Sequence, residues 1–324
     1  MEFLNIFFTP DFYSATFRLA TPLMLAALGG VISERSGVLN MALEGQILMG
    51  AFFGYLGSYL FQNVWLGVLT AMLGSLFLAA LHAFMSIKVK VNQVVSAVGL
   101  NTLALGITST LFRFLFGTDS QMASCPGMMN LDISVLSDLP FVGPVLFSQH
   151  PLTYIAVALL ILLNLFLFRT SRGLELRAAG ENPQALDVAG VDVIRIRWLA
   201  VLATGLFCGL AGASLTLTGL NTFYDNLSSG RGFIAYAAVV FGKWTPVGAA
   251  LAAILFGAGD ALQLRMQTIF DIPYYFYMMM PYLITFFALV FFMGAAKGPA
   301  ANSIPFEKDK GRRGSARRSR TGGN

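Results

Sequence analysis

The residues that could do chemistry in this chain are few, and they lie between apolar runs. The stretch ISERSGVLNMALEGQ, residues 32–46, places Glu34, Arg35 and Glu44 between two long hydrophobic segments. Ionic side chains in such surroundings are costly unless they pair, reach water or line a path for a polar solute. Two interpretations follow. Asn40 and Glu44 form a gate beside a solute path, or the stretch is a plain polar connection in which packing or a nearby arginine neutralises Glu44.

No group of residues has the spacing of a catalytic or metal site. His82 and His150 are isolated, Cys125 and Cys208 are far apart, and no acidic pair is spaced for hydrolysis. The phosphate-binding pattern G-x-x-x-x-G-K-[ST] is also absent from the sequence. We therefore expect no catalytic residue, no metal and no cofactor on this chain, which is not expected to be an enzyme.

The composition indicates a membrane protein. Of 324 residues, 56% are hydrophobic and 11% are charged, and several apolar runs approach or exceed the roughly 20 residues that a helix needs to cross a bilayer. We predict an all-α polytopic membrane domain over residues 1–296, with about nine spans (roughly eight to ten), one of them short. The expected spans are about 12–32, 43–62, 64–86, 94–116, 151–169, 198–220, 233–243, 247–267 and 275–295. The pairs Gly50/Gly54 and Gly205/Gly209 are expected to allow close helix packing.

Lysine and arginine in the connections predict the orientation of the chain. With the N-terminus outside, the inner connections hold most of the basic residues, while the outer loop 117–150 holds none. The C-terminus is then cytoplasmic. The basic tail, residues 297–324, is expected to be disordered and solvated, with contact to anionic lipid heads as a secondary effect. Binding of nucleic acid is not expected, because the basic residues are not interleaved with aromatic ones.

The largest inner connection, residues 170–197, carries helix signals. Asn182 suits a helix N-cap, Pro183 the first helical position and Gly190 the position after the end, which predicts a short helix over 183–189. A second short helix is expected at about 174–179, with Gly180 separating the two. Such a hairpin could present a stiff surface to a cytosolic partner. An amphipathic loop held on the lipid surface by its arginines is the alternative.

Amides and aromatic side chains near the ends of the spans are candidates for the substrate path. Aromatic faces can stack on a nucleobase and amides can bond its edges, whereas the ordinary alternative for each amide is a helix cap or an interhelical hydrogen bond. The candidates for gate or path are Asn40, Glu44, Asn92, Gln93, Asn101, Asn221, Phe223 and Tyr224.

Four segments together resemble one family of transport proteins. GENPQALDVAGVDV (180–193) resembles the cytoplasmic coupling loop of ATP-binding-cassette (ABC) importer permeases of the ribose, branched-chain amino acid and nucleoside branch. ERSGVLNMALEGQILMGAFF (34–53), VNQVV (91–95) and GRGFIAYAAVVFGKWTPVGA (230–249) are similar to the same branch, in the expected order. The first and last of these three are most similar to nucleoside-type permeases that work with a lipoprotein receptor of the basic-membrane-protein kind.

The resemblance implies a permease subunit of a nucleoside importer in the bacterial cytoplasmic (inner) membrane. Its partners would be an ABC ATPase subunit that binds ATP and Mg, a second, related permease forming a heterodimer, and an extracytoplasmic substrate-binding lipoprotein. The loop would dock on the ATPase through Glu175, Arg177, Gly180, Glu181, Asn182, Pro183, Asp187 and Gly190.

Two alternatives stay open. The same machine could carry a simple sugar such as ribose or galactose. An ion-coupled secondary transporter or channel would instead need acidic residues within the membrane, for which Asp260 is the best candidate. Arg18 and Asp260 could form an intramembrane ion pair, or each could separately reach a wet cavity or the membrane surface.

Overall fold

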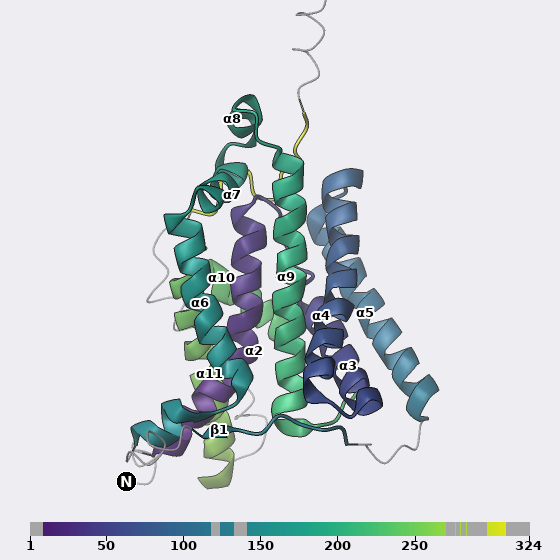
Figure 1. The fold of residues 1–324 in the computed structure, drawn as a ribbon, viewed down its shortest axis with the longest axis vertical. Coiled ribbons are helices and arrows are strands. Elements are labelled where there is room, and N and C mark those ends of the chain that lie inside the picture. Colours follow the sequence, from purple (N-terminus) through teal and green to yellow (C-terminus); the bar gives the residue numbers. More distant parts are fainter. Residues whose placement is uncertain are drawn as a thin grey trace, which may run out of the picture.

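The computed structural model describes residues 9–117, 124–132, 141–269 and 297–308, together with Phe276, Met279 and Leu283. Helices dominate this part of the chain (Figure 1). They are α2 (Pro10–Arg35), α3 (Leu43–Phe61), α4 (Val64–Ala83), α5 (Gln93–Phe116), α6 (Pro151–Arg169), α7 (Ser171–Glu181), α8 (Pro183–Val188), α9 (Val193–Leu215), α10 (Arg231–Phe241) and α11 (Pro246–Ile269). Wider π-helical turns, η1 (Phe84–Val89) and η3 (Thr216–Leu220), extend α4 and α9, and η2 (Gly143–Phe147) precedes α6. Two short strands, β1 (Leu131–Asp132) and β2 (Ser148–Gln149), pair antiparallel, with Leu131 opposite Gln149.

Six of these helices are long and apolar enough to cross a membrane. They lie at Pro10–Arg35, Val64–Val89, Gln93–Phe116, Pro151–Arg169, Val193–Gly219 and Pro246–Gln267. The expected spans 43–62 and 233–243 correspond to α3 and α10, which are helical but do not meet the same criteria. The ninth expected span, 275–295, lies outside the described residues apart from Phe276, Met279 and Leu283. The described part of the chain therefore holds six candidate spans of the nine predicted.

Helix α2 forms the centre of the bundle, packed along α9 and α11. Small residues allow this approach: a Cβ on Gly29 would lie 3.2 Å from the Thr204 carbonyl oxygen of α9, and one on Gly257 of α11 would lie 2.7 Å from Ala20. In a bilayer such contacts replace the hydrophobic driving force, which apolar lipid does not supply between helices. Helices α5 and α6 instead leave much of their surface exposed.

Three of the four glycines in the two predicted pairs, Gly50, Gly205 and Gly209, lie where neighbouring helices touch. A Cβ on Gly50 of α3 would be 2.9 Å from the Cα of Gly209 on α9, and a Cβ on Gly209 would be 2.5 Å from the Cα of Met72 on α4. Gly205 meets Ala79 of α4 in the same way, at 2.5 Å. The prediction that these glycines serve close packing is confirmed.

Helices α7 and α8 form a hairpin at one end of the bundle, and α8 lies farthest along its long axis (Figure 1). This end is called the hairpin end below. Residues 297–308, named here the C-terminal strap, lie against the hairpin. The strap was expected to be the start of a solvated tail, yet Ala301 is 7% and Phe306 is 9% exposed. The rest of the predicted tail, 309–324, lies outside the described residues.

The connection between α2 and α3 is not a simple turn at the hairpin end. Residues 36–40 are buried, and α3 starts at the level of Asn101, two turns into α5, where Asn101 Oδ1 accepts the N–H of Gly45 over 2.9 Å. Helix α10, of 11 residues, is about 16 Å long, and the turn that directly follows it, at Lys243 and Trp244, bonds Arg35 at the hairpin end. Its first turn is therefore about half a hydrocarbon thickness away from that end.

Candidate functional site

The α7–α8 hairpin is built by the signals that the sequence carries. The Asn182 side chain accepts the N–H of Ala185 over 3.0 Å, with Pro183 as the first residue of α8 and Gly190 beyond its end at φ +89°. The predicted helix over 183–189 is confirmed. Helix α7 is longer than the expected 174–179, because the Thr170 hydroxyl caps its start. Gly180 does not separate the two helices: it lies within α7, where a Cβ would come 2.3 Å from the carbonyl oxygen of Arg35.

The hairpin has one buried side and one exposed side. Leu176, Ala179 and Gly180 face the bundle, whereas Leu174 is 59% and Val188 is 71% exposed. Isolated exposed apolar side chains are common, but here they lie on a rigid helical projection among charged residues. That surface suits a protein partner, because the hairpin extends along the bundle axis (Figure 1).

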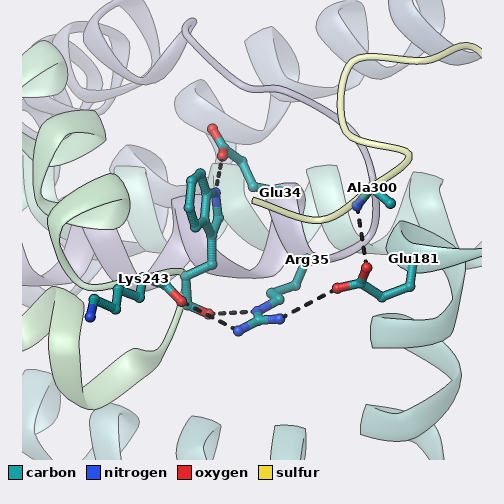
Figure 2. Close-up of polar contacts among 6 residues, drawn as sticks. Glu34, Arg35, Glu181, Lys243 and Ala300 are labelled. Carbon is teal, nitrogen blue, oxygen red and sulfur yellow. Dashed lines mark hydrogen bonds and ion pairs between the residues drawn. The ribbon is translucent and has the colours of Figure 1, made fainter. Parts of the chain in front are cut away.

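Glu34 and Arg35 tie the end of α2 to three other segments (Figure 2). Arg35 Nε donates to the Trp244 carbonyl over 2.6 Å, and an Arg35 Nη1 lies 3.9 Å from a carboxylate oxygen of Glu181. Glu34 accepts a bond from the Trp244 indole N–H and one of 3.2 Å from the Asn302 amide. The junction thus joins α2, the turn between α10 and α11, the end of α7 and the C-terminal strap.

This junction carries signs of local strain. Lys243 and Trp244 both have φ +53°, a left-handed conformation that residues with side chains rarely adopt. Glu34 is 1% exposed, and its Oε1 has no hydrogen-bond partner among the described residues. Strained backbone and unpaired buried oxygens persist where surrounding contacts impose them, and they often mark parts that move or bind. The turn between α10 and α11 is therefore a candidate for transmitting motion from the hairpin.

Glu44 lies deep in the bundle and caps the start of α10. One carboxylate oxygen accepts the Ser228 hydroxyl over 2.6 Å and the Gly230 N–H over 2.8 Å, while the other accepts the Gly232 N–H over 2.6 Å. A helix start presents unpaired N–H groups and the positive end of its dipole, both of which favour a carboxylate. Because a Cβ on Gly232 would lie 2.3 Å from the backbone of Glu44, only glycine allows this approach.

The amides predicted near the path make structural hydrogen bonds. Asn92 caps α5 by accepting the N–H groups of residues 94 and 95. Gln93 accepts the Leu39 N–H over 2.7 Å, and Asn101 also donates to the Met41 carbonyl over 3.1 Å. Asn40 accepts the Ala42 N–H over 3.1 Å. The cap and interhelical alternatives thus describe the contacts present, and these amides hold the buried connection between α2 and α3 in place.

Of the three residues predicted after η3, only Tyr224 is exposed. Phe223 is fully buried in an aromatic cluster, with its ring 5.2 Å from Phe52 and 5.3 Å from Phe112. Asn221 takes a left-handed conformation, and its backbone bonds the N–H of Cys125. Tyr224 is 38% exposed.

Arg18 and Asp260 have separate electrostatic partners. Burial and then the charge of Arg18 lower the pKa of His150, which precedes α6. Arg231 is the charged group that acts on the Asp260 carboxylate. The ion pairs found in the described ranges do not include one between Arg18 and Asp260.

One groove was not singled out from the sequence. Helix α5 exposes a shallow groove whose lining includes Gly99, Thr102, Gly106 and Thr110, and at its far end Arg113 forms an ion pair of 2.9 Å with Asp225. This bond from Arg113 holds the pKa of Asp225 below its usual value. Hydroxyls and glycines recurring every three or four residues in an apolar helix are the sequence signal that could have revealed it.

A second groove, of about 380 Å³, lies between α2, α6, α7 and α9. Its lining is apolar except for Arg172 and Glu175, so it offers few partners for the hydroxyls of a polar solute.

Comparison with known proteins assigns the chain to a family. The family described as "Branched-chain amino acid transport system / permease component" matches residues 12–289. The chain belongs to this permease family. A guanosine ABC transporter permease protein, NupQ of Bacillus subtilis, is 39% identical over 91% of this chain and 96% of its own length. A nucleoside ABC transporter permease protein, NupC of Lactococcus lactis, is 35% identical over 90% of this chain and 95% of its own.

A putative glucose ABC transporter permease protein, TsgC13 of Haloferax volcanii, is 40% identical over 81% of this chain and 79% of its own length. No solved structure matches the chain. As an ABC permease, this multi-pass membrane protein works with an ATPase and a substrate-binding protein.

Proposed function

We propose that this chain is the membrane-spanning permease subunit of an ABC importer for nucleosides. The observation that carries the proposal is the similarity to NupQ and NupC over nearly the whole length of all three chains. The capped, projecting α7–α8 hairpin supports it, because a subunit without its own ATPase site needs a stiff surface on which the hydrolysing subunit acts. ATP and Mg would be bound by that partner.

The orientation follows from the basic residues. The hairpin end carries Arg35, Arg172, Arg177 and Arg195, so it faces the cytoplasm of a bacterial inner membrane, and α2 starts on the outer side. The second permease would be a related chain rather than a copy, and a lipoprotein receptor would deliver substrate from outside.

Motion would pass from the hairpin to the membrane domain through the Glu34–Arg35 junction. Glu181 on α7 and the Trp244 carbonyl share the Arg35 guanidinium. A displaced hairpin therefore acts at once on α2 and on α10, whose other end is held by Glu44. Glu175, Arg177 and Asp187 are the hairpin's candidate contacts to the ATPase.

The substrate path would run along the groove of α5. Thr102 and Thr110 offer hydroxyls there, and Tyr224 offers an exposed aromatic face on which a base could stack. Asn101 lies on the same helix, half-buried, and Asn40 and Glu44 mark the inner end of this region. The second permease would close the open side of the groove.

Uptake by cells that lack the gene and carry either the wild type or a variant tests this function. Labelled guanosine and other nucleosides should enter with the wild type, and entry should stop when ATP is depleted. Gly190→Val forces a branched residue into φ +89° and should lower uptake strongly, whereas Asp192→Asn keeps a cap at the start of α9 and should not. Uptake that survives both ATP depletion and Gly190→Val would refute the proposal and favour an ion-coupled transporter.

A simple sugar is the second candidate cargo, because TsgC13 has nearly the same identity to this chain as NupQ, although over a smaller share of the chain. Labelled glucose, ribose and galactose in the same cells decide between them. Sugar uptake without nucleoside uptake would support the same kind of ABC importer with a sugar as its substrate.

A further inference from the structure

The C-terminal strap contacts the hairpin through its backbone and through one buried ring. The Ala301 N–H donates to the Gly180 carbonyl over 2.8 Å, and the Ala300 N–H lies 3.3 Å from a carboxylate oxygen of Glu181. Figure 2 shows Ala300 and Arg35 on either side of this carboxylate. Phe306 packs in a buried cluster with Ala179 of α7 and Val193 of α9.

Arg197 on α9 makes the strap part of the buried structure. The residue is 2% exposed, and in the described contacts its guanidinium donates only to carbonyls: to Ser36 over 3.1 Å, to Ala179 over 3.3 Å and to Ile304 of the strap over 2.9 Å. A buried cation that loses one of these acceptors leaves donors unpaired, at a cost larger than that of a surface contact. The Arg197 side chain therefore joins the hairpin, the end of α2 and the strap.

The far end of the strap reaches two further elements. Lys308 lies 3.1 Å from Asp187 of α8, and Glu307 lies 2.8 Å from Lys90, which follows η1 at the start of the connection to α5. These exposed pairs are individually weak, but they show that the strap crosses from α2 to α8 and to the α4–α5 connection. The strap itself lies beyond residues 12–289, which the family match covers.

We propose that the C-terminal strap is a positioning element for the coupling hairpin: it fixes the angle of α7 and α8 relative to α2, so that force on the hairpin reaches the membrane domain. This inference rests on the proposed coupling function of the hairpin. Without the strap, α8 keeps its cap and its helix, but the hairpin loses its contacts with Phe306 and the Ala301 N–H, and Arg197 loses the Ile304 carbonyl. The hairpin is then joined to α2 only through the Arg35–Glu181 pair, Arg197 and the Gly180 contact, and a given displacement of the hairpin moves α2 less.

The test uses the complete transporter, with ATPase, both permeases and receptor, reconstituted in lipid vesicles. The measured quantity is substrate taken up per ATP hydrolysed. Truncation after Lys308 removes only residues 309–324 and serves as the control, while truncation after Gly298 removes most of the strap. Phe306→Ala and Phe306→Leu provide a milder pair, because leucine keeps an apolar side chain in the cluster.

We expect Phe306→Ala and the truncation after Gly298 to lower uptake per ATP by about fivefold or more, the lower end of typical couplings between linked sites. Phe306→Leu should keep most of the wild-type uptake per ATP, and truncation after Lys308 should leave this ratio unchanged. Hydrogen exchange should accelerate in residues 171–188 of Phe306→Ala and not in α9, which separates loss of positioning from general unfolding.

Three outcomes would contradict the proposed role of the strap or the proposed function of the hairpin. Unchanged uptake per ATP in both Phe306→Ala and the truncation after Gly298 would overturn the role of the strap. Accelerated exchange throughout the bundle, with the ratio falling only in step with lost protein, would make the strap a general stabiliser and overturn it as well. Gly190→Val in the same vesicles tests the hairpin itself: if that variant keeps the wild-type ratio, the coupling function fails, whatever the Phe306 variants show.

Discussion

Replacing Glu44 by glutamine should destabilise the bundle, because the Glu44 carboxylate is the cap of α10. In the wild type its two oxygens accept one hydroxyl and two backbone N–H groups, all within 2.8 Å. A glutamine amide keeps one acceptor oxygen and places a donor where the other oxygen stood. The N–H of Gly232 or of Gly230 then faces another donor and loses its partner.

The size of the effect can be worked from these contacts. Losing one hydrogen bond to a charged group costs about 1.5–3 kcal/mol, and leaving a buried donor unpaired costs about 1–3 kcal/mol. Part of this sum is offset, because the variant no longer holds an ionised carboxylate away from water. We expect a net loss of about 2 kcal/mol, or about 4–8 °C in apparent unfolding temperature by the scaling for domains of roughly 150–250 residues.

Thermal unfolding of the purified subunit in lipid nanodiscs, followed by tryptophan fluorescence, measures this loss. Asp192→Asn is the matched control: Asp192 caps α9 by accepting the Arg195 N–H over 3.2 Å, and asparagine caps as well as aspartate. Its unfolding temperature should stay within about 2 °C of the wild type. A Glu44→Gln protein as stable as the wild type, or more stable, would show that the carboxylate is not an ionised cap.

Three further predictions concern the junction, the hairpin and the α5 end. Trp244→Phe removes the indole donor from its buried carboxylate partner and should cost about 1.5–3 kcal/mol, measured as a lower unfolding temperature. Gly180→Ala cannot place its Cβ against the end of α2 and should reduce uptake, whereas Gly219→Ala, with no atom within 4 Å of its Cβ, should not. The lowered pKa of Asp225 means that its pairing with Arg113 stabilises the fold above the unfolded pKa and is lost as pH falls through the lower folded pKa. The difference in unfolding temperature between the wild type and Asp225→Asn should therefore be present at pH 7 and should close on acidification below about pH 4.

The positions of the helices could be predicted from the sequence, because long apolar runs leave the backbone no other way to satisfy its hydrogen bonds in lipid. The cap of α8 could be predicted too, since Asn182, Pro183 and Gly190 act within one short stretch. Both signals are local. They need no knowledge of which segments lie side by side.

The partners of the charged residues could not be predicted in the same way. Glu44 and Gly232 are 188 positions apart, and Glu34 and Asn302 are 268 apart. The strap has the Gly, Pro and polar composition of a solvated tail, and only its contacts with buried Arg197 show otherwise. Phe223 is an aromatic residue of the kind that can stack on a base, but its place in an aromatic cluster depends on Phe52 of α3 and Phe112 of α5, which are far away in the sequence.

The glycine contacts among α3, α4 and α9 restrict how this protein can change shape. Where backbone touches backbone, no side chain can switch rotamer to absorb a shift, so sliding by part of a turn would bring main-chain atoms into collision. These three helices should therefore travel as one rigid body during a transport cycle. The bending must then occur in connections that hold no such contacts. The segment before α10 is the place to look for a hinge, because a Cβ on Gly230 would meet no atom within 4 Å.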